Sequence, residues 1–288
     1  MNTKLRISVC QYKIVDDKTI NILNTFNQIV AASEKNPNIV VLPECFVCPY
    51  DINIFKENSE PIDNFFDSIK SPATCMLRNA SIKYPNIYIV GGTIIESEYV
   101  EQLDKTLYFN TCLVFKNGII IGKYRKMNLY NINIKEHYYC EADVLTNGII
   151  PTIFDTEFGK VGLGICYDIR FGNLAEFYQK KGCNIIIYPG SFNRFTGPKH
   201  WLVLQKARAL DNQLFIVSCS SACQFNSCYE SYGKSFIISP WADIINETEL
   251  DKEEIITSEI DINDVTLTRT KLPILKSINN IKIESKLF

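Results

Sequence analysis

The stretch Gly159-Lys-Val-Gly-Leu-Gly-Ile-Cys166-Tyr-Asp-Ile-Arg-Phe171 indicates a strand that runs into a turn and a helix. Val161, Leu163 and Ile165 alternate with small residues, which predicts a strand buried on at least one face. Residues 174–181 then show helical spacing of apolar side chains among polar ones. This order of elements predicts a strand–turn–helix unit of an α/β fold.

Cys166 stands at the end of the predicted strand, just before the turn. Backbone N–H groups and the positive end of a helix dipole favour a thiolate at such a place. The position therefore suits a nucleophile. The alternative is a small hydrophobic residue that ends a core strand, the usual role of a free cysteine. This stretch alone leaves both interpretations open.

The composition excludes several classes of protein. The chain has 288 residues, 46% hydrophobic and 22% charged, which suits one large domain with a sizeable core. A net charge of −2 gives no attraction to nucleic acid or an anionic membrane, and no apolar run is long enough to span one. The N-terminus shows no signal-peptide pattern. The 11 cysteines lack a disulfide framework, so we expect free thiols and a cytoplasmic location.

Apolar patterns along the chain predict one α/β domain, with mixed sheets and helices outside them. The expected strands lie at 5–9, 38–42, 87–95, 183–188, 214–218, 234–239 and 254–260, and a hairpin joins 107–115 to 118–124. The expected helices lie at 18–33, 62–84, 174–181, 200–210 and 261–270, the last with Asp261 as its N-cap. Residues 130–147 suggest an irregular surface loop over a site, and 271–288 show no clear periodicity.

Two more residues whose side chains could take part in catalysis follow predicted strands. Glu44 ends the apolar run at 38–42, and Lys126 ends the second strand of the hairpin. Alone, Glu44 has the alternative explanation of a residue in solvent at the sheet rim, and Lys126 is better explained as one more member of a basic patch. Together with Cys166 they are informative, because a thiol nucleophile needs a base and its oxyanion needs a cation or N–H donors.

Other chemistries receive less support. His137 and His200 leave a Cys–His hydrolase open, without a local signature. The pair Cys45-Phe-Val-Cys48 has redox spacing but lacks a thioredoxin-like helix start, so a structural role is favoured. No zinc pattern is formed by Cys219, Cys223 and Cys228, and no phosphate-binding or dinucleotide-binding glycine motif is present.

Three motifs, in this order, resemble the carbon–nitrogen hydrolases of the nitrilase superfamily. They are Leu42-Pro-Glu-Cys-Phe46, Tyr124-Arg-Lys126 and Gly164-Ile-Cys-Tyr-Asp-Ile-Arg-Phe171. The resemblance covers residues 4–275, and three ordered motifs are far more specific than one. The omega-amidase branch looks most similar, through Tyr188-Pro-Gly-Ser-Phe-Asn193, Thr196-Gly-Pro-Lys-His-Trp201 and Arg208-Ala-Leu-Asp-Asn-Gln213. The rival branch, deaminated-glutathione amidase, shares the Gly-Pro-x-His-Trp motif.

The resemblance implies a four-layer αββα sandwich over residues 1–275, with a tail at 276–288 that lies at a subunit interface. It implies a homodimer, a small-molecule amide substrate, and no metal or organic cofactor. The apolar residues of the C-terminal segment support an interface, because they suit neither a free tail nor a helix of its own: Leu272, Ile274, Leu275, Ile278, Ile281 and Ile283.

The family's catalytic roles carry over to Glu44 as general base, Lys126 as transition-state stabiliser and Cys166 as nucleophile. A second family glutamate corresponds to Glu141. The substrate pocket is expected to include Tyr50, Tyr167 with its backbone N–H at the oxyanion, Arg170, Phe192 and Thr196. One position departs from the family, since relatives usually carry histidine where this chain has Asn128.

An omega-amidase substrate such as 2-oxoglutaramate or 2-oxosuccinamate bears a carboxylate at its far end. A guanidinium can grip a carboxylate at two points, so Arg170 is the expected clamp, the alternative being a surface ion pair. Two other classes stay open: a hydrolase of nitriles or N-carbamoyl compounds, and a catalytically silent binding protein.

Overall fold

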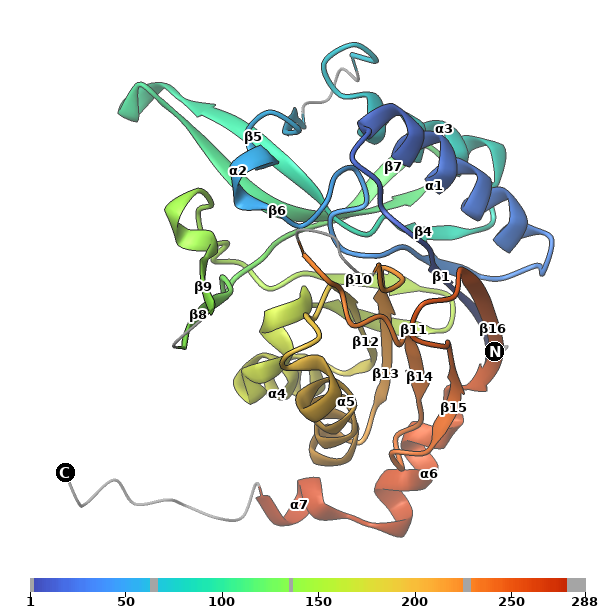
Figure 1. Ribbon diagram of the computed structural model, residues 1–288. Helices are drawn as coiled ribbons and strands as arrows, with labels where there is room; N and C mark the ends of the chain where they lie inside the picture. The colour runs from blue at the N-terminus through green and yellow to red at the C-terminus, as the bar shows by residue number, and fades with distance from the viewer. Residues whose placement is uncertain (1–2, 63–66, 135–136, 225–228, 279–288) are drawn as a thin grey trace.

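Two β-sheets lie face to face at the centre of the computed structural model, with helices on their outer sides (Figure 1). The structure describes residues 3–62, 67–134, 137–224 and 229–278. The first sheet has the strand order β16-β1-β2-β4-β6-β5-β3, with β7 paired to β6. Its strands are β1 Lys4–Gln11, β2 Ile39–Val41, β3 Glu60–Pro61, β4 Tyr88–Val90, β5 Ile94–Val100, β6 Lys105–Lys116, β7 Ile119–Arg125 and β16 Glu254–Asp261.

The second sheet follows the order β10-β11-β12-β13-β14-β15. Its strands are β10 Ile153–Thr156, β11 Gly159–Leu163, β12 Cys183–Gly190, β13 Phe215–Ser220, β14 Phe236–Ile238 and β15 Ile244–Glu247. The neighbours β11, β12 and β13 are parallel, so their carboxyl ends meet at one edge of the sheet. The strands β10 and β15 were not expected from the sequence.

Side-chain alternation explains why the first sheet is covered on both faces. Ile39 and Val41 of β2 join the core between the two sheets, whereas Val40 points to the opposite side, toward the helices. The β1 residues Leu5, Ile7 and Val9 also belong to the inter-sheet core. A strand whose successive side chains are all buried requires a layer on each side.

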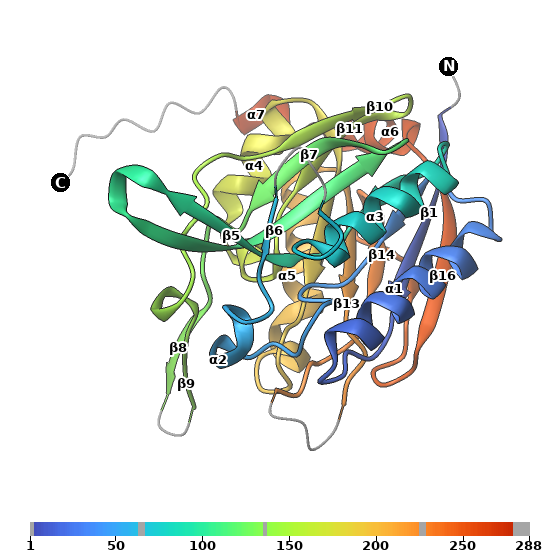
Figure 2. The ribbon, with the colours of Figure 1, turned by 90° about the horizontal axis from the view of Figure 1, so that it is seen from above.

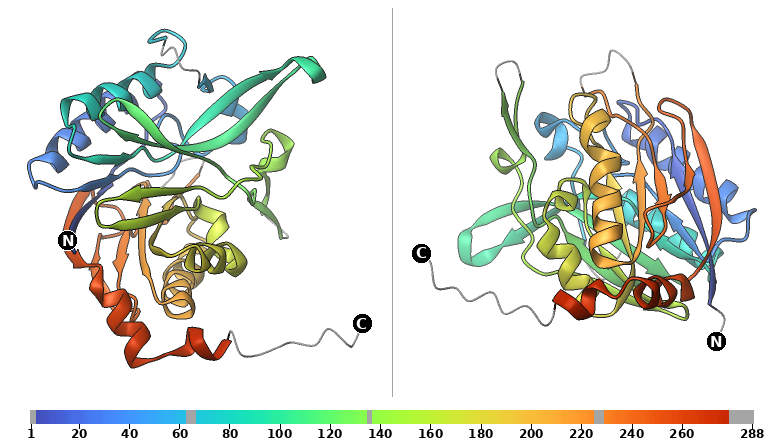
Figure 3. Two further views of the ribbon diagram at one scale, coloured as in Figure 1. Left: turned by 180° about the vertical axis from the view of Figure 1, so that it is seen from behind. Right: turned by 90° about the horizontal axis from the view of Figure 1, so that it is seen from below.

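The helices complete the outer layers (Figures 1 and 3). They are α1 Lys18–Ser33, α2 Ile52–Phe55, α3 Pro72–Lys83, α4 Gly172–Lys180, α5 Gly197–Asn212, α6 Asn263–Lys271 and α7 Ile274–Ile278. Helices α1 and α3 lie outside the first sheet, and α4 and α5 outside the second. The expected αββα sandwich is therefore present. Two hairpins extend beyond the sandwich: β5–β6, with a 3-10 turn η1 at Glu101–Leu103, and the pair of β8 Asn131–Ile134 and β9 His137–Cys140 (Figure 2).

The expected helix at 62–84 is too long. Residues 63–66 lie outside the described part of the chain, and the helix begins only at Pro72. Proline suits the first turn of a helix and disfavours helical backbone in the residue before it. The Glu60 carboxylate accepts hydrogen bonds from the backbone N–H groups of Ala73 and Thr74, both at 3.0 Å, and so satisfies the free helix end.

The expected irregular loop at 130–147 contains regular structure instead. Strands β8 Asn131–Ile134 and β9 His137–Cys140 pair antiparallel, and a 3-10 turn η2 follows at Glu141–Asp143. Ile132 stands opposite Tyr139 in this ladder. Such β-branched and aromatic pairs across two strands stabilise a ladder, although the polar residues between them hide the pattern in the sequence.

Two expectations near the C-terminus were also wrong. The N-cap of α6 is Ile262, because Asp261 still belongs to β16, although its carboxylate accepts from the Asn263 N–H at 2.9 Å. Residues 274–278 form the short helix α7, where no helix was expected. Residues 279–288 lie outside the described part of the chain, and the interface role of the tail stays a prediction.

Candidate active site

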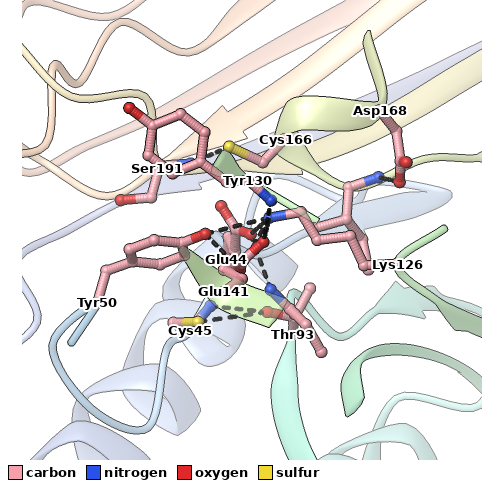
Figure 4. Close-up of polar contacts among 12 residues, drawn as sticks. Glu44, Cys45, Tyr50, Thr93, Lys126, Tyr130, Glu141, Cys166, Asp168 and Ser191 are labelled. Atoms are coloured by element: carbon pink, nitrogen blue, oxygen red, sulfur yellow. Dashed lines mark hydrogen bonds and ion pairs between the residues drawn. The ribbon is translucent and has the colours of Figure 1, made fainter. Parts of the chain in front are cut away.

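Glu44, Lys126 and Cys166 come together although they are far apart in the chain (Figure 4). Glu44 follows β2 and Lys126 follows β7, both in the first sheet, whereas Cys166 follows β11 in the second. All three are buried. The sandwich therefore assembles the three residues at the end where strands of both sheets finish.

Lys126 lies between two carboxylates. Its Nζ is 3.0 Å from Glu44 Oε1 and 2.9 Å from Glu141 Oε2, and it also donates to the Tyr50 hydroxyl at 3.1 Å. Burial acts to lower the pKa of Lys126, but the charges of Glu141 and Glu44 outweigh it and hold the pKa well above its usual value. The buried ammonium thus stays charged beside the thiol.

Glu44 is not a rim residue, since its side chain is fully enclosed. Asn110 Nδ2 donates to its Oε1 at 2.9 Å, and the buried Oε2 has no hydrogen-bond partner among the described residues. Burial raises the pKa of Glu44, and the positive charge of Lys126 opposes that rise. The Cys166 side chain is close enough to interact with this carboxylate. A buried carboxylate that is oriented by its neighbours beside a thiol can act as a general base.

Cys166 begins a 3-10 turn, η3 Cys166–Arg170, with a positive φ of 46°. A positive φ is rare for a residue with a side chain, and such strain gathers at functional sites. The Ser191 N–H donates to Sγ at 3.5 Å. Gly164 permits the tight approach behind it, because a Cβ there would lie 2.3 Å from the Tyr188 ring.

The expected resting thiolate is not what the structure favours. Burial, followed by the negative charge of Glu44, raises the pKa of Cys166 well above its usual value, against Lys126 and the Ser191 N–H. The dipole argument fails because α4 begins only at Gly172, so no α-helix starts at the sulfur. The thiol therefore rests protonated and requires a base.

Asp168 ties the turn at Cys166 to the loop after Lys126. Its buried carboxylate accepts from the Ile165 N–H at 2.9 Å, the Tyr124 hydroxyl at 2.8 Å, and both the backbone and side-chain N–H of Asn128 at 2.8 Å. The departure at Asn128 therefore has a definite structural role. Sequence reasoning missed Asp168, although its place two residues after the cysteine was a signal.

Glu141 lies in the site as expected. Its Oε1 accepts from the Tyr50 hydroxyl at 2.5 Å, and its Oε2 accepts from the Tyr130 N–H at 2.5 Å. Tyr50 is buried, and its hydroxyl bonds to Glu141 and Lys126. It therefore belongs both to the polar cluster of Glu44, Lys126 and Glu141 and to the pocket wall. Tyr130 was not predicted, and the 3-10 turn η2 that places Glu141 falls within the segment expected to be irregular.

A small cavity of about 10 Å³ opens onto Cys166. Its walls include all five residues expected in the pocket, together with four that were not: Tyr130, Ser191, Asn193 and Tyr229. A larger cavity of about 300 Å³ opens onto Glu44, and Tyr50, Ser191 and Tyr229 stand between the two. The two reacting groups thus line adjoining spaces.

Arg170 forms no surface ion pair with the described residues. Its guanidinium carbon lies 4.9 Å from the Phe192 ring centre and 5.3 Å from that of Tyr167. Its Nε is buried and has no hydrogen-bond partner among the residues that the structure describes. A half-buried cation that lines the pocket and has no carboxylate partner there is suited to an anionic ligand.

The described part of the structure does not support the redox, zinc or Cys–His hypotheses. Cys45 and Cys48 are buried free cysteines, and burial raises the pKa of each. Cys228 lies outside the described residues, within which no group of histidine, cysteine and acidic side chains could hold a metal ion. The described residues also include no helix long and apolar enough to cross a membrane. His200 lies beside Arg170, away from the polar cluster.

Comparison with known proteins shows the family to which this chain belongs. The carbon-nitrogen hydrolase family model matches residues 6–270. The chain belongs to this family, whose members are hydrolases of carbon–nitrogen bonds, and to the nitrilase superfamily. A crystal structure of Saccharomyces cerevisiae Nit3, from branch 10 of that superfamily, aligns with a TM-score of 0.84 and 35% identity over 94% of this chain and 95% of that one.

Within the family, the chain is similar to proteins named as omega-amidases. The chloroplastic omega-amidase of Arabidopsis thaliana is 40% identical over 94% of this chain and 72% of its own length. The omega-amidase NIT2 of Homo sapiens is 34% identical over 95% of each chain. The expected family is thereby confirmed, together with its omega-amidase branch.

Proposed function

We propose that this protein is an omega-amidase that hydrolyses the terminal amide of a small oxo-dicarboxylic acid monoamide, such as 2-oxoglutaramate or 2-oxosuccinamate. One observation carries the proposal. The cavity that reaches the Cys166 thiol is also lined by Arg170, a half-buried cation without a carboxylate partner in the described chain. A short substrate with an amide at one end and a carboxylate at the other is chemically complementary to these two groups.

The first half of the reaction forms a thioester. Glu44 takes the proton of the Cys166 thiol, and the thiolate attacks the amide carbon. The Lys126 ammonium and the Tyr167 backbone N–H stabilise the resulting oxyanion. Glu44 then gives its proton to the amide nitrogen, the carbon–nitrogen bond breaks, and ammonia leaves.

The second half regenerates the thiol. Glu44 removes a proton from water, and the hydroxide attacks the thioester carbon. The carbon–sulfur bond breaks, the proton returns from Glu44 to sulfur, and the dicarboxylate leaves. Glu141 keeps Lys126 charged and oriented through both stages, since its carboxylate lies 2.9 Å from the ammonium.

Ammonia release from a panel of substrates tests this function. We expect the highest kcat/KM with 2-oxoglutaramate or 2-oxosuccinamate. Deaminated glutathione, a nitrile and an N-carbamoyl compound represent the alternative activities. Preference for any of these three would replace the proposed substrate class, and no ammonia from the whole panel would favour a silent binding protein.

The change Arg170→Lys tests the carboxylate clamp. Lysine keeps the charge but loses the planar two-point fit, so kcat/KM for an oxo-acid amide should fall about ten- to a hundredfold. An amide without the second carboxylate should be a poor substrate for the parent and nearly unaffected by the change. Equal losses on both amides would show that Arg170 supports the fold and that the carboxylate is recognised elsewhere.

We further propose that the protein works in the cytoplasm. The ten cysteines of the described chain are all free thiols, as a reducing compartment favours. Microscopy of the full chain carrying a C-terminal fluorescent tag tests this, and signal confined to an organelle would contradict it.

A further inference from the structure

The half-buried guanidinium of Arg170 has one side-chain hydrogen-bond contact in the described chain, and that contact is a histidine. Arg170 Nη1 lies 3.1 Å from His200 Nδ1. Arg170 ends the turn that begins with Cys166, and His200 lies in the first turn of α5. The α5 residue Arg208 holds the same turn through its backbone, since it donates to the carbonyl oxygens of Ile169 and Arg170.

This contact fixes the protonation state of the imidazole. A guanidinium has only N–H donors and stays charged, so His200 Nδ1 must be the acceptor. The imidazole is then neutral and carries its proton on Nε2. If Nδ1 were protonated, an N–H would face an N–H, and in the doubly protonated imidazolium a cation would also face a cation.

We propose that neutral His200 is a positioning residue for substrate specificity, which holds the Arg170 guanidinium in the orientation that receives the substrate's carboxylate. The aromatic rings of Tyr167 and Phe192 hold the guanidinium near their faces but do not set its rotation. The hydrogen bond to His200 uses Nη1 and fixes that rotation, so the rest of the guanidinium keeps its orientation beside the cavity that Arg170 lines. This inference rests on the proposed omega-amidase activity.

The charges around His200 support a neutral imidazole. Burial, the Arg170 charge and the charge of the adjacent Lys199 all lower its pKa. Tyr130, just before β8, also lies near Arg170, but burial raises its pKa to about 12, so it stays neutral. The contact with Arg170 therefore exists above the His200 pKa and is lost as the pH falls through it. Discrimination for the carboxylate should weaken in acid.

A pair of His200 variants separates positioning from packing. The change His200→Phe keeps a ring but removes the acceptor, and His200→Asn replaces Nδ1 by an amide oxygen that accepts and does not titrate. We expect His200→Phe to raise KM for the oxo-acid amide about tenfold, the value of one hydrogen bond to a charged group. His200→Asn should restore most of this loss, and Lys199→Gln, on the exposed neighbour, should leave KM near that of the parent.

The pH dependence is measured as a ratio of kcat/KM for the oxo-acid amide to kcat/KM for an amide without the second carboxylate. Both substrates require Glu44, so its titration cancels. The ratio should fall in acid for the parent and stay flat for His200→Asn. If the ratio still falls at low pH in His200→Asn, another group must titrate, and this result would overturn the role of His200.

Nuclear magnetic resonance gives a test that does not depend on turnover. The chain has 2 histidines, so His200→Asn assigns both imidazole signals. We expect the His200 signal to report the Nε2–H form, and its titration midpoint to rise in Arg170→Ala. A parent enzyme that ignores the substrate carboxylate would defeat the proposed function whatever the signal shows. A parent that prefers it, but carries the His200 proton on Nδ1 or keeps its KM in His200→Phe, would defeat only the positioning role.

Discussion

At the scale of single residues, the buried Lys126 forms ion pairs with two glutamates, Glu44 and Glu141, and this arrangement sets the charges at the site. Lys126 is permanently charged, while burial raises the pKa of Glu44 above its ordinary 4.5. Glu44 must be ionised to act as a base, so kcat/KM should fall as the pH drops through this raised pKa. The profile of kcat/KM against pH for an amide without a second carboxylate measures it. Full activity persisting below pH 4.5 would contradict Glu44 as the base.

The nucleophile can be tested at the same scale. Cys166→Ala should abolish turnover with little change in folding, because no other thiol can form the thioester. Mass spectrometry with substrate should show an acyl group on the parent and none on the variant. Cys48→Ser, a buried cysteine on the wall of the neighbouring cavity, is the control and should retain activity. A large catalytic loss in this control would restore the redox interpretation of Cys45 and Cys48.

At the scale of elements, Asp168 joins the turn after β11 to the loop after β7. Asp168→Ala leaves buried donors without an acceptor at about 1–3 kcal/mol each, so we expect a loss of about 3–5 kcal/mol in the free energy of unfolding. Because the change also releases Cys166 from Lys126, kcat should fall further than in Tyr124→Phe, which removes one of these bonds and about 1 kcal/mol. Denaturant unfolding and kcat measure both effects. Equal kcat in the two variants would exclude a role of this bridge in catalysis.

At the scale of the whole molecule, we predict a two-fold dimer through the outer face of α5 and the C-terminal segment. Val203 and Leu210 are seven residues apart on α5, and both are exposed, at 65% and 46%. Exposed Leu272 lies close to the start of α7. Light scattering should give twice the chain mass for the full chain, and the monomer mass for V203D/L210D and for a chain that ends at Lys271. A monomeric full chain would remove the prediction.

The sequence by itself determined most of the fold, because the decisive patterns are local. Helix α1 matches its predicted bounds, and β1, β2 and the β6–β7 hairpin lie where alternation and turn residues placed them. The long α3 prediction failed because periodicity continues past the point where Pro72 starts the helix. The β8–β9 pair was missed because its stability comes from contacts across strands, which spacing along one strand does not reveal.

The sequence also determined the catalytic candidates, since Glu44, Lys126 and Cys166 each follow a recognisable strand. Only the tertiary structure decided their electrostatics. Burial and the neighbouring Glu44 raise the pKa of the Cys166 thiol, where the local turn alone suggested a thiolate. Likewise, the contact between Arg170 and His200 joins two segments 30 residues apart. Residue types and periodicity are written along the chain, but desolvation and charge interactions depend on what the fold brings within a few ångströms.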